Sequence, residues 1–189
     1  AGTVAVAGTA VRTTGVVAAE PSNGFACVTC HDDLAEYTLH AVTAVPFPSG
    51  KSVTFSTEKD DKGALKPVAA NLCLECHQGR LSTVTMNNYL APYKAVQDTP
   101  TDKLAFQNVH YFSAGATIFG NTAKGIYEYD GKTYAGRFMH AEGFQTCTDC
   151  HDKHTLEIKV SVCTACHTTV KTLADVEKIR MTKENYDGS

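Results

Sequence analysis

The sequence predicts a mostly irregular chain with short α-helices and a few short β-strands, in which bound groups fill much of the interior. Leu, Ile, Val and Phe make up about a fifth of the 189 residues, and Trp is absent. Such a composition lies close to the range in which a chain alone cannot bury enough apolar surface to offset the entropy of ordering. The second observation is that the eight cysteines form four C-x-x-C pairs, each followed at once by histidine.

The four C-x-x-C-H motifs predict what fills that interior. Their cysteines are Cys27, Cys30, Cys73, Cys76, Cys147, Cys150, Cys163 and Cys166, and their histidines are His31, His77, His151 and His167. The pattern is that of covalent c-type haem attachment, in which two thiols become thioethers on the porphyrin edge. A short helical turn then brings the histidine under the ring to bind the iron. We therefore expect four covalently bound haem c groups and a haem-dominated multihaem cytochrome c architecture.

Three other uses of paired cysteines fit the sequence less well. Four disulfides would not explain the histidine behind every pair. A zinc site takes four ligands from two pairs, usually without a histidine directly behind each pair, and the distances between pairs here are very unequal. A thioredoxin-like redox pair occurs once, after a strand and at the start of a helix, rather than four times.

The four remaining histidines match the number of iron positions still to be filled. They are His40, His110, His140 and His154. Four haems need four sixth ligands, so we expect bis-histidine ligation; methionine is the alternative, but nothing marks Met86, Met139 or Met181 for this role. His154 follows His151 by three residues, on the same side of an expected helical turn, whereas the two axial ligands of one iron approach from opposite faces. We therefore expect His154 to ligate a neighbouring haem.

Full histidine ligation has a functional consequence. If all eight histidines bind iron, no iron keeps the open coordination position that oxygen-binding and substrate-reducing haems need. The sequence therefore predicts an electron-transfer protein rather than an enzyme. Two rivals stay open: a soluble periplasmic tetrahaem electron shuttle, and a multihaem reductase for nitrite or a sulfur oxyanion. Because the haems would supply much of the apolar interior, we also expect the chain without haem to be largely unfolded.

The expected organisation is a single tetrahaem domain over residues 1–189. Its parts are an N-terminal arm (1–24), a segment with the first two haem motifs (25–109), a segment with the second two (110–170), and a C-terminal helix and tail (170–189). Four local predictions follow: a solvated loop within 46–68, a β-hairpin over 125–136 that turns at Asp130-Gly131, a short strand from Leu156 to Val162, and a helix from Val170 to Lys183.

Charge and hydropathy exclude some partners and indicate a location. The formal net charge is −3, and four haems with ionised propionates would bring it to about −7 when oxidised and about −11 when reduced. Nucleic acid is therefore not an expected partner. No segment reaches the roughly 18 apolar residues that a membrane-spanning helix needs. Haem attachment to C-x-x-C-H takes place outside the cytoplasm, so we expect a secreted protein whose signal peptide has been cleaved.

The segment that begins at His110, HYFSAGATIFGNTAKGIYEYDGKTYAGRFMHAEGFQTCTDCHDKHTLEI, resembles the extracellular multihaem c-type cytochromes of metal-reducing bacteria. The haem count and the chain length resemble the OmcE-type family of tetrahaem filament, or nanowire, cytochromes. The resemblance implies a head-to-tail homopolymer with a continuous chain of stacked haems. It also implies that one axial histidine is donated across the subunit boundary, with His40 as our candidate.

A filament is also reasonable on physical grounds. A thin protein shell around four haems leaves apolar haem edges exposed, and such patches are interaction sites. Head-to-tail contacts that do not close into a ring give open helical polymers. We therefore expect a cell-surface filament subunit that carries electrons over long distances to extracellular metal oxides. Its expected protein partners are further copies of itself and outer-membrane and periplasmic cytochromes.

Overall fold

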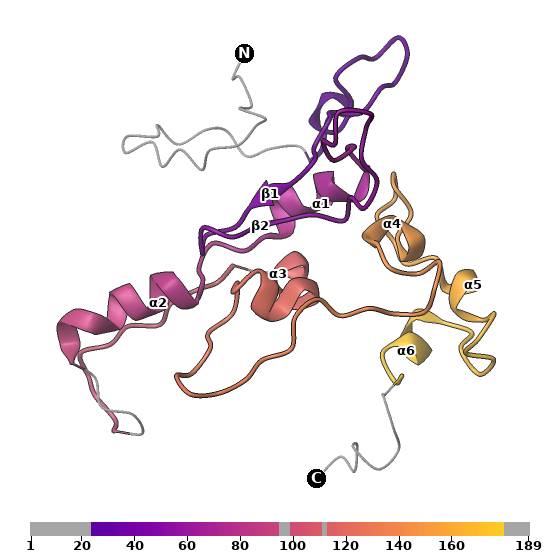
Figure 1. Ribbon diagram of the computed structural model, residues 1–189. Helices are drawn as coiled ribbons and strands as arrows, with labels where there is room; N and C mark the ends of the chain where they lie inside the picture. Colours follow the sequence, from indigo (N-terminus) through magenta and orange to yellow (C-terminus); the bar gives the residue numbers. More distant parts are fainter. Residues whose placement is uncertain (1–23, 95–98, 111–112, 180–189) are drawn as a thin grey trace. The chain divides into compact units, whose positions relative to one another are not determined.

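The protein was analysed as a computed structural model that describes residues 24–94, 99–110 and 113–179 (Figure 1). Its helices are short and most of the described chain is irregular, which confirms the loop-rich part of the predicted fold class. The dominance of haem in that architecture stays a prediction. Among the described residues, no helix is long and apolar enough to cross a membrane, in agreement with the sequence. The predicted arm over 1–24 lies outside the described residues except for Gly24.

The chain divides into two compact units, Ala1–Phe138 and Met139–Ser189. The first contains η1 (Cys27–Thr29), β1 (Val45–Pro46), β2 (Ser52–Val53), α1 (Ala70–His77), α2 (Thr83–Leu90), η2 (Ala91–Tyr93), α3 (Ala114–Phe119) and η3 (Gly120–Thr122). The second contains α4 (Cys147–Cys150), α5 (Val160–Cys163) and α6 (Leu173–Val176). Each unit therefore carries two of the four C-x-x-C-H motifs.

The core of the first unit lies where α1 packs against β1 and against α3. β1 and β2 pair antiparallel with Val45 opposite Val53, and both valines are buried. The ring of Phe119 lies 5.0 Å from that of Phe55 between centroids. The guanidinium of Arg137 lies over these two rings, at 5.5 and 4.9 Å from their centroids. Each such contact contributes about 0.5–1.5 kcal/mol, so Arg137 helps to hold the end of this unit against α3.

Asn71, in the first turn of α1, ties this helix to the chain around β1 and β2. Its side chain is fully buried. The amide nitrogen donates to the carbonyl oxygens of Val42 at 2.9 Å and Thr43 at 3.0 Å, and the amide oxygen accepts the N–H of Phe55 at 2.8 Å. A polar side chain is tolerated in a core only when it is hydrogen-bonded in this way. Asn71 thereby fixes the start of the helix that carries the second motif.

Gly115 allows α3 to lie directly against the end of α1. A Cβ atom at this position would lie 2.8 Å from Cδ2 of Leu74 and 2.9 Å from the carbonyl oxygen of His77. Glycine is the residue that permits such close backbone approach. α1, whose last turn contains the second motif, is therefore fixed at its start by Asn71 and at its end by the contact with α3.

The second unit has little apolar core within its described residues, 139–179. Val170 is the one buried apolar side chain in this range. Two of the three helices are stabilised by local capping boxes, Thr146 with Asp149 at α4 and Thr172 with Asp175 at α6. Four-residue helices with one buried side chain do not offset the entropy of ordering this length of chain. A bound apolar group would contribute most in such a unit.

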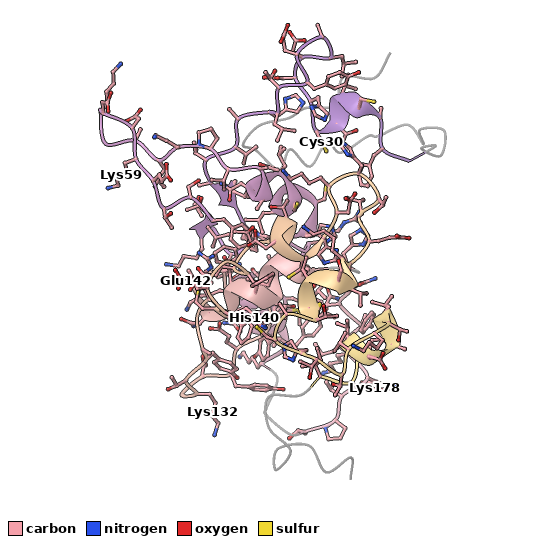
Figure 2. The ribbon with its side chains drawn as sticks, turned by 90° about the vertical axis from the view of Figure 1, so that its right-hand side faces the viewer. Cys30, Lys59, Lys132, His140, Glu142 and Lys178 are labelled. Carbon is pink, nitrogen blue, oxygen red and sulfur yellow. The ribbon has the colours of Figure 1, made fainter. Side chains whose placement is uncertain are left out.

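Two local predictions in the first unit are partly right. The predicted loop over 46–68 contains most of the β1–β2 hairpin, but its charged stretch around Asp60 is exposed; Lys59 of this stretch is labelled in Figure 2. The predicted hairpin over 125–136 forms its turn, with the N–H of Lys132 donating to the carbonyl oxygen of Tyr129 at 3.2 Å. Its arms are not paired strands, because the returning arm bonds elsewhere: the carbonyl oxygen of Ala135 accepts the N–H of Asn121 at 2.8 Å.

Two predictions in the second unit need larger corrections. The strand predicted from Leu156 to Val162 is wrong: Ile158 forms one isolated bridge with His151, and α5 begins at Val160. The helix predicted from Val170 to Lys183 is shorter within the described residues, because its N-cap Thr172 is extended and α6 spans Leu173–Val176. The part of this prediction beyond residue 179 lies outside the described residues.

Candidate haem-attachment sites

Each C-x-x-C-H motif forms a closed helical turn, as the sequence predicts. The histidine N–H donates to the carbonyl oxygen of the first cysteine at 2.9 Å for His31, 2.8 Å for His151 and 2.8 Å for His167. The second motif forms the end of α1, which finishes at His77. Residues at positions i, i+3 and i+4 of a helical turn share one face. Both thiols and the imidazole of a motif therefore emerge on the same side.

The imidazoles of the first and third motifs are oriented by backbone carbonyls. Nδ1 of His31 lies 2.8 Å from the carbonyl oxygen of Tyr37, and Nδ1 of His151 lies 2.9 Å from that of Leu156. A carbonyl oxygen only accepts, so Nδ1 carries the proton in both rings and Nε2 keeps its lone pair. Metal-ligating histidines usually donate this hydrogen bond from the ring nitrogen that does not bind the metal. Both rings are therefore in the tautomer that binds a metal through Nε2.

The same two motifs are followed by equivalent loops. The N–H of Asp32 donates to the carbonyl oxygen of Thr38 at 3.0 Å, and the N–H of Asp152 donates to the carbonyl oxygen of Glu157 at 2.9 Å. The residue whose carbonyl holds the imidazole has a positive φ in each loop, 53° at position 37 and 63° at position 156. A left-handed residue turns its carbonyl back toward the motif. We call these segments, residues 27–40 and 147–159, the motif loops; Cys30 of the first one is labelled in Figure 2.

The thiols of neighbouring motifs interact within each unit. Burial raises the pKa of the Cys76 thiol, and the charges of Glu75, Cys30 and Cys73 add to this effect. Burial likewise raises the pKa of Cys150, with a further contribution from Cys163. Thiols of one motif therefore lie near those of the next motif in the same unit. A redox-active C-x-x-C pair needs a lowered thiol pKa, which is the opposite direction.

The eight cysteines occur as free thiols. None of the eight forms a disulfide, and all of them lie in the described part of the chain. Within the described residues, no three His, Cys, Asp or Glu side chains converge to hold a metal ion directly. A haem site requires no such cluster, because the porphyrin nitrogens supply four of the iron ligands.

The four histidines outside the motifs divide equally between the two units. His40 and His110 belong to the first unit, and His140 and His154 belong to the second. The ring of His40 donates from Nε2 to the carbonyl oxygen of Val28 at 3.0 Å. His110 follows directly on residue 109, whose carbonyl oxygen accepts the N–H of Arg80 at 3.0 Å, so it lies close to the second motif in space. Each unit thus has two motifs and two further histidines.

The rings of His140 and His167 lie at a separation that two axial ligands of one ion would have. Their ring centroids are 6.3 Å apart and their planes are inclined at 34°. An imidazole nitrogen lies about 1.1 Å from its ring centroid and about 2.0 Å from a metal that it binds. Two imidazoles on opposite sides of one ion therefore have centroids roughly 6.2 Å apart. The observed spacing agrees with this value.

The helical argument for His154 is wrong. α4 ends at Cys150, and His151 is extended, with φ −95° and ψ 140°. His154 instead lies in a turn in which Oδ1 of Asp152 accepts its backbone N–H at 2.9 Å. The same segment brings the carbonyl oxygen of Leu156 to the His151 ring. Ligation of a neighbouring haem by His154 stays a prediction without that support.

Large apolar side chains are exposed beside the motifs. Phe25, two residues before the first motif loop, is 70% exposed, and Tyr37 within that loop is 63% exposed. In the second unit Met139, next to His140, and Leu156, in the other motif loop, are also about half exposed. A porphyrin attached to the adjacent cysteines is an apolar surface of the right kind to cover them.

The equivalence of the motif loops is a feature that the sequence analysis missed. The one sequence feature that indicates this equivalence is an aspartate directly after the motif histidine, which gives C-x-x-C-H-D at residues 27–32 and 147–152. Comparisons with protein-family models, with curated proteins and with solved structures find no match to this chain. The resemblance of the segment that begins at His110 therefore stays a prediction, and the functional argument depends on the motif geometry.

Proposed function

We propose that the protein is a tetrahaem c-type cytochrome that transfers electrons and has no catalytic site. The observation that carries this proposal is that all four C-x-x-C-H motifs form helical turns with two thiols and an imidazole on one side. Haem c bound at these turns would supply a one-electron iron couple. His31, His77, His151 and His167 would be the proximal ligands, and the tautomers of His31 and His151 suit this role.

The remaining histidines would close the sixth coordination positions. The spacing of His140 and His167 supports their assignment to one iron in the second unit. His40, His110 and His154 would serve the other three haems. With histidine on both faces, the chain would hold the iron low-spin and would deny it to small ligands. This supports electron transfer over reduction of a bound substrate.

The finer proposal is that the protein is a secreted subunit of a cell-surface cytochrome filament that delivers electrons to metal oxides. It is supported by the sequence resemblance and by apolar side chains exposed at the motifs, such as Phe25. One histidine of the chain would ligate a haem of the next subunit. The rival that the same motif geometry allows is a soluble periplasmic tetrahaem shuttle.

Three measurements on the purified protein test these proposals. The intact mass should exceed that of the polypeptide by four haem groups, and an unmodified mass would refute the cytochrome proposal. Electron paramagnetic resonance of the oxidised protein should show low-spin iron throughout, whereas a large high-spin fraction would favour a reductase. Electron microscopy should show filaments; dispersed particles with four haems would favour the shuttle.

A further inference from the structure

Lys159 holds the third motif from the far end of its loop. Its backbone N–H donates to the carbonyl oxygen of Cys150 at 2.8 Å. Its ammonium nitrogen donates to the carbonyl oxygen of Thr148 at 3.0 Å, in a partly buried contact. Thr148 stands between the two cysteines that would carry a haem. One residue therefore contacts the motif at two carbonyl oxygens, those of Thr148 and Cys150.

The first motif is held in the same manner by a different side chain. The backbone N–H of His40 donates to the carbonyl oxygen of Cys30 at 3.0 Å. Its ring Nε2 donates to the carbonyl oxygen of Val28 at 3.0 Å, and Val28 occupies the place in its motif that Thr148 has in the other. His40 and Lys159 are thus equivalent positions in the two motif loops, although one loop is a residue longer.

The geometry of the loops explains why a side chain is needed here. In a continuing helix, the carbonyl of Thr148 would accept the N–H of Asp152, four residues on. That N–H donates instead to the carbonyl oxygen of Glu157. In the first loop, the N–H of Asp32 donates instead to the carbonyl oxygen of Thr38. The carbonyl between the cysteines therefore loses its helical partner in both loops. A lysine in one case and a histidine in the other replace the missing N–H donor.

We propose that Lys159 is a positioning residue for haem attachment at Cys147 and Cys150, and that His40 has the same role at Cys27 and Cys30. This inference rests on the proposed cytochrome function. The two side chains share only the ability to donate a hydrogen bond over this distance, so the shared requirement is the donated N–H. The bond keeps the turn between the two cysteines closed, which fixes both thiols relative to the proximal imidazole. It also engages Nε2 of His40, so only Nδ1 of this ring would be available to a metal while the bond is intact.

The test exchanges the donors between the loops of the full-length, haem-loaded protein. Lys159→Met removes the N–H donor at similar length, and Lys159→His introduces the donor that the first loop uses. Lys153→Met, at an exposed position in the same loop, is the control for the loss of one positive charge. The readout is the haem occupancy of the peptide that contains Cys147 and Cys150, by mass spectrometry, together with the low-spin spectrum of the protein.

In Lys159→Met the ratio of attached to unattached haem at this peptide should fall about five- to tenfold, the factor that one lost hydrogen bond represents. Lys159→His and Lys153→Met should retain the wild-type ratio and spectrum. The inference is overturned if Lys159→Met matches the wild type in both readouts, or if Lys159→His behaves like Lys159→Met. A wild-type protein that carries no haem would instead refute the cytochrome function itself.

If the Lys159→Met protein does not accumulate in the cell, the corresponding substitutions of His40 in the first motif loop provide the test. His40→Lys should keep haem on the peptide with Cys27 and Cys30, and His40→Met should lose it by a similar factor. Occupancy of this peptide reports thioether formation and not axial ligation, so a ligand role of His40 does not change the expected result. Equal occupancy in His40→Lys and His40→Met would overturn the inference.

Discussion

Replacement of His140 should change the ligation of one haem and leave all four haems attached. The 6.3 Å between the ring centroids of His140 and His167 is close to the roughly 6.2 Å expected when one nitrogen of each ring binds the same ion from opposite sides at about 2 Å. His140→Ala removes one of these nitrogens and touches no thioether. About a quarter of the haem iron should therefore become five-coordinate and high-spin. Paramagnetic resonance of the oxidised protein measures this fraction, and intact mass gives the haem count.

Two companion variants make this prediction specific. His140→Met offers a thioether ligand, so one haem should remain low-spin with a raised reduction potential. Glu142→Ala changes an exposed residue two positions along the same segment (Figure 2) and should remain fully low-spin. If His140→Ala is fully low-spin with four haems attached, the pairing with His167 is refuted. Loss of a haem from the protein would contradict the assumption that His140 acts only as an axial ligand.

Three further predictions concern the fold. Asn71→Ala leaves the carbonyl oxygen of Val42 and the N–H of Phe55 without partners, so the free energy of unfolding should fall by about 2–4 kcal/mol in denaturant titration, while Asn87→Ala, at an exposed position of α2, should change it little. Gly115→Ala places a methyl group against α1 and should cost about 1–3 kcal/mol; an Ala114→Ser protein with the same loss would contradict the close-approach argument. Bonds from the Lys171 and Thr172 N–H groups and the Thr172 hydroxyl lower the pKa of Asp175 to about 2. The α6 cap should therefore be fully formed above pH about 4 and be lost as the pH falls through about 2, as hydrogen exchange at Thr172 can show, and Asp175→Asn should remove this pH dependence.

Local motifs were readable from the sequence because their geometry is set within five residues. The turn from Cys147 to His151 needs only helical hydrogen bonds and a capping box, and both involve neighbouring residues. The turn at Asp130-Gly131 was readable for the same reason, since Gly131 adopts a positive φ of 73°. Whether the flanking arms pair depends on bonds to residues 118–121, which no local pattern encodes.

Longer-range features could not be predicted from one sequence. Pro46 and Pro48 made the β1–β2 segment read as a loop, although Val45 and Val53 pair and are buried. The role of Asn71 depends on carbonyls almost 30 residues earlier in the chain. The equivalence of His40 and Lys159 was hidden because the two side chains differ and their loops differ in length. In each case the decisive contact joins residues whose separation carries no periodic signal.

The motif loops have a consequence for how such a chain is made. Every bond that closes the loop over 147–159 joins residues at most eleven positions apart, and contacts of this kind form in microseconds or less. Such a loop can therefore form transiently on an otherwise unfolded chain, without contacts to distant segments. An attachment enzyme outside the cytoplasm would then need to recognise only a segment the size of a short peptide, and could load the four sites independently of one another.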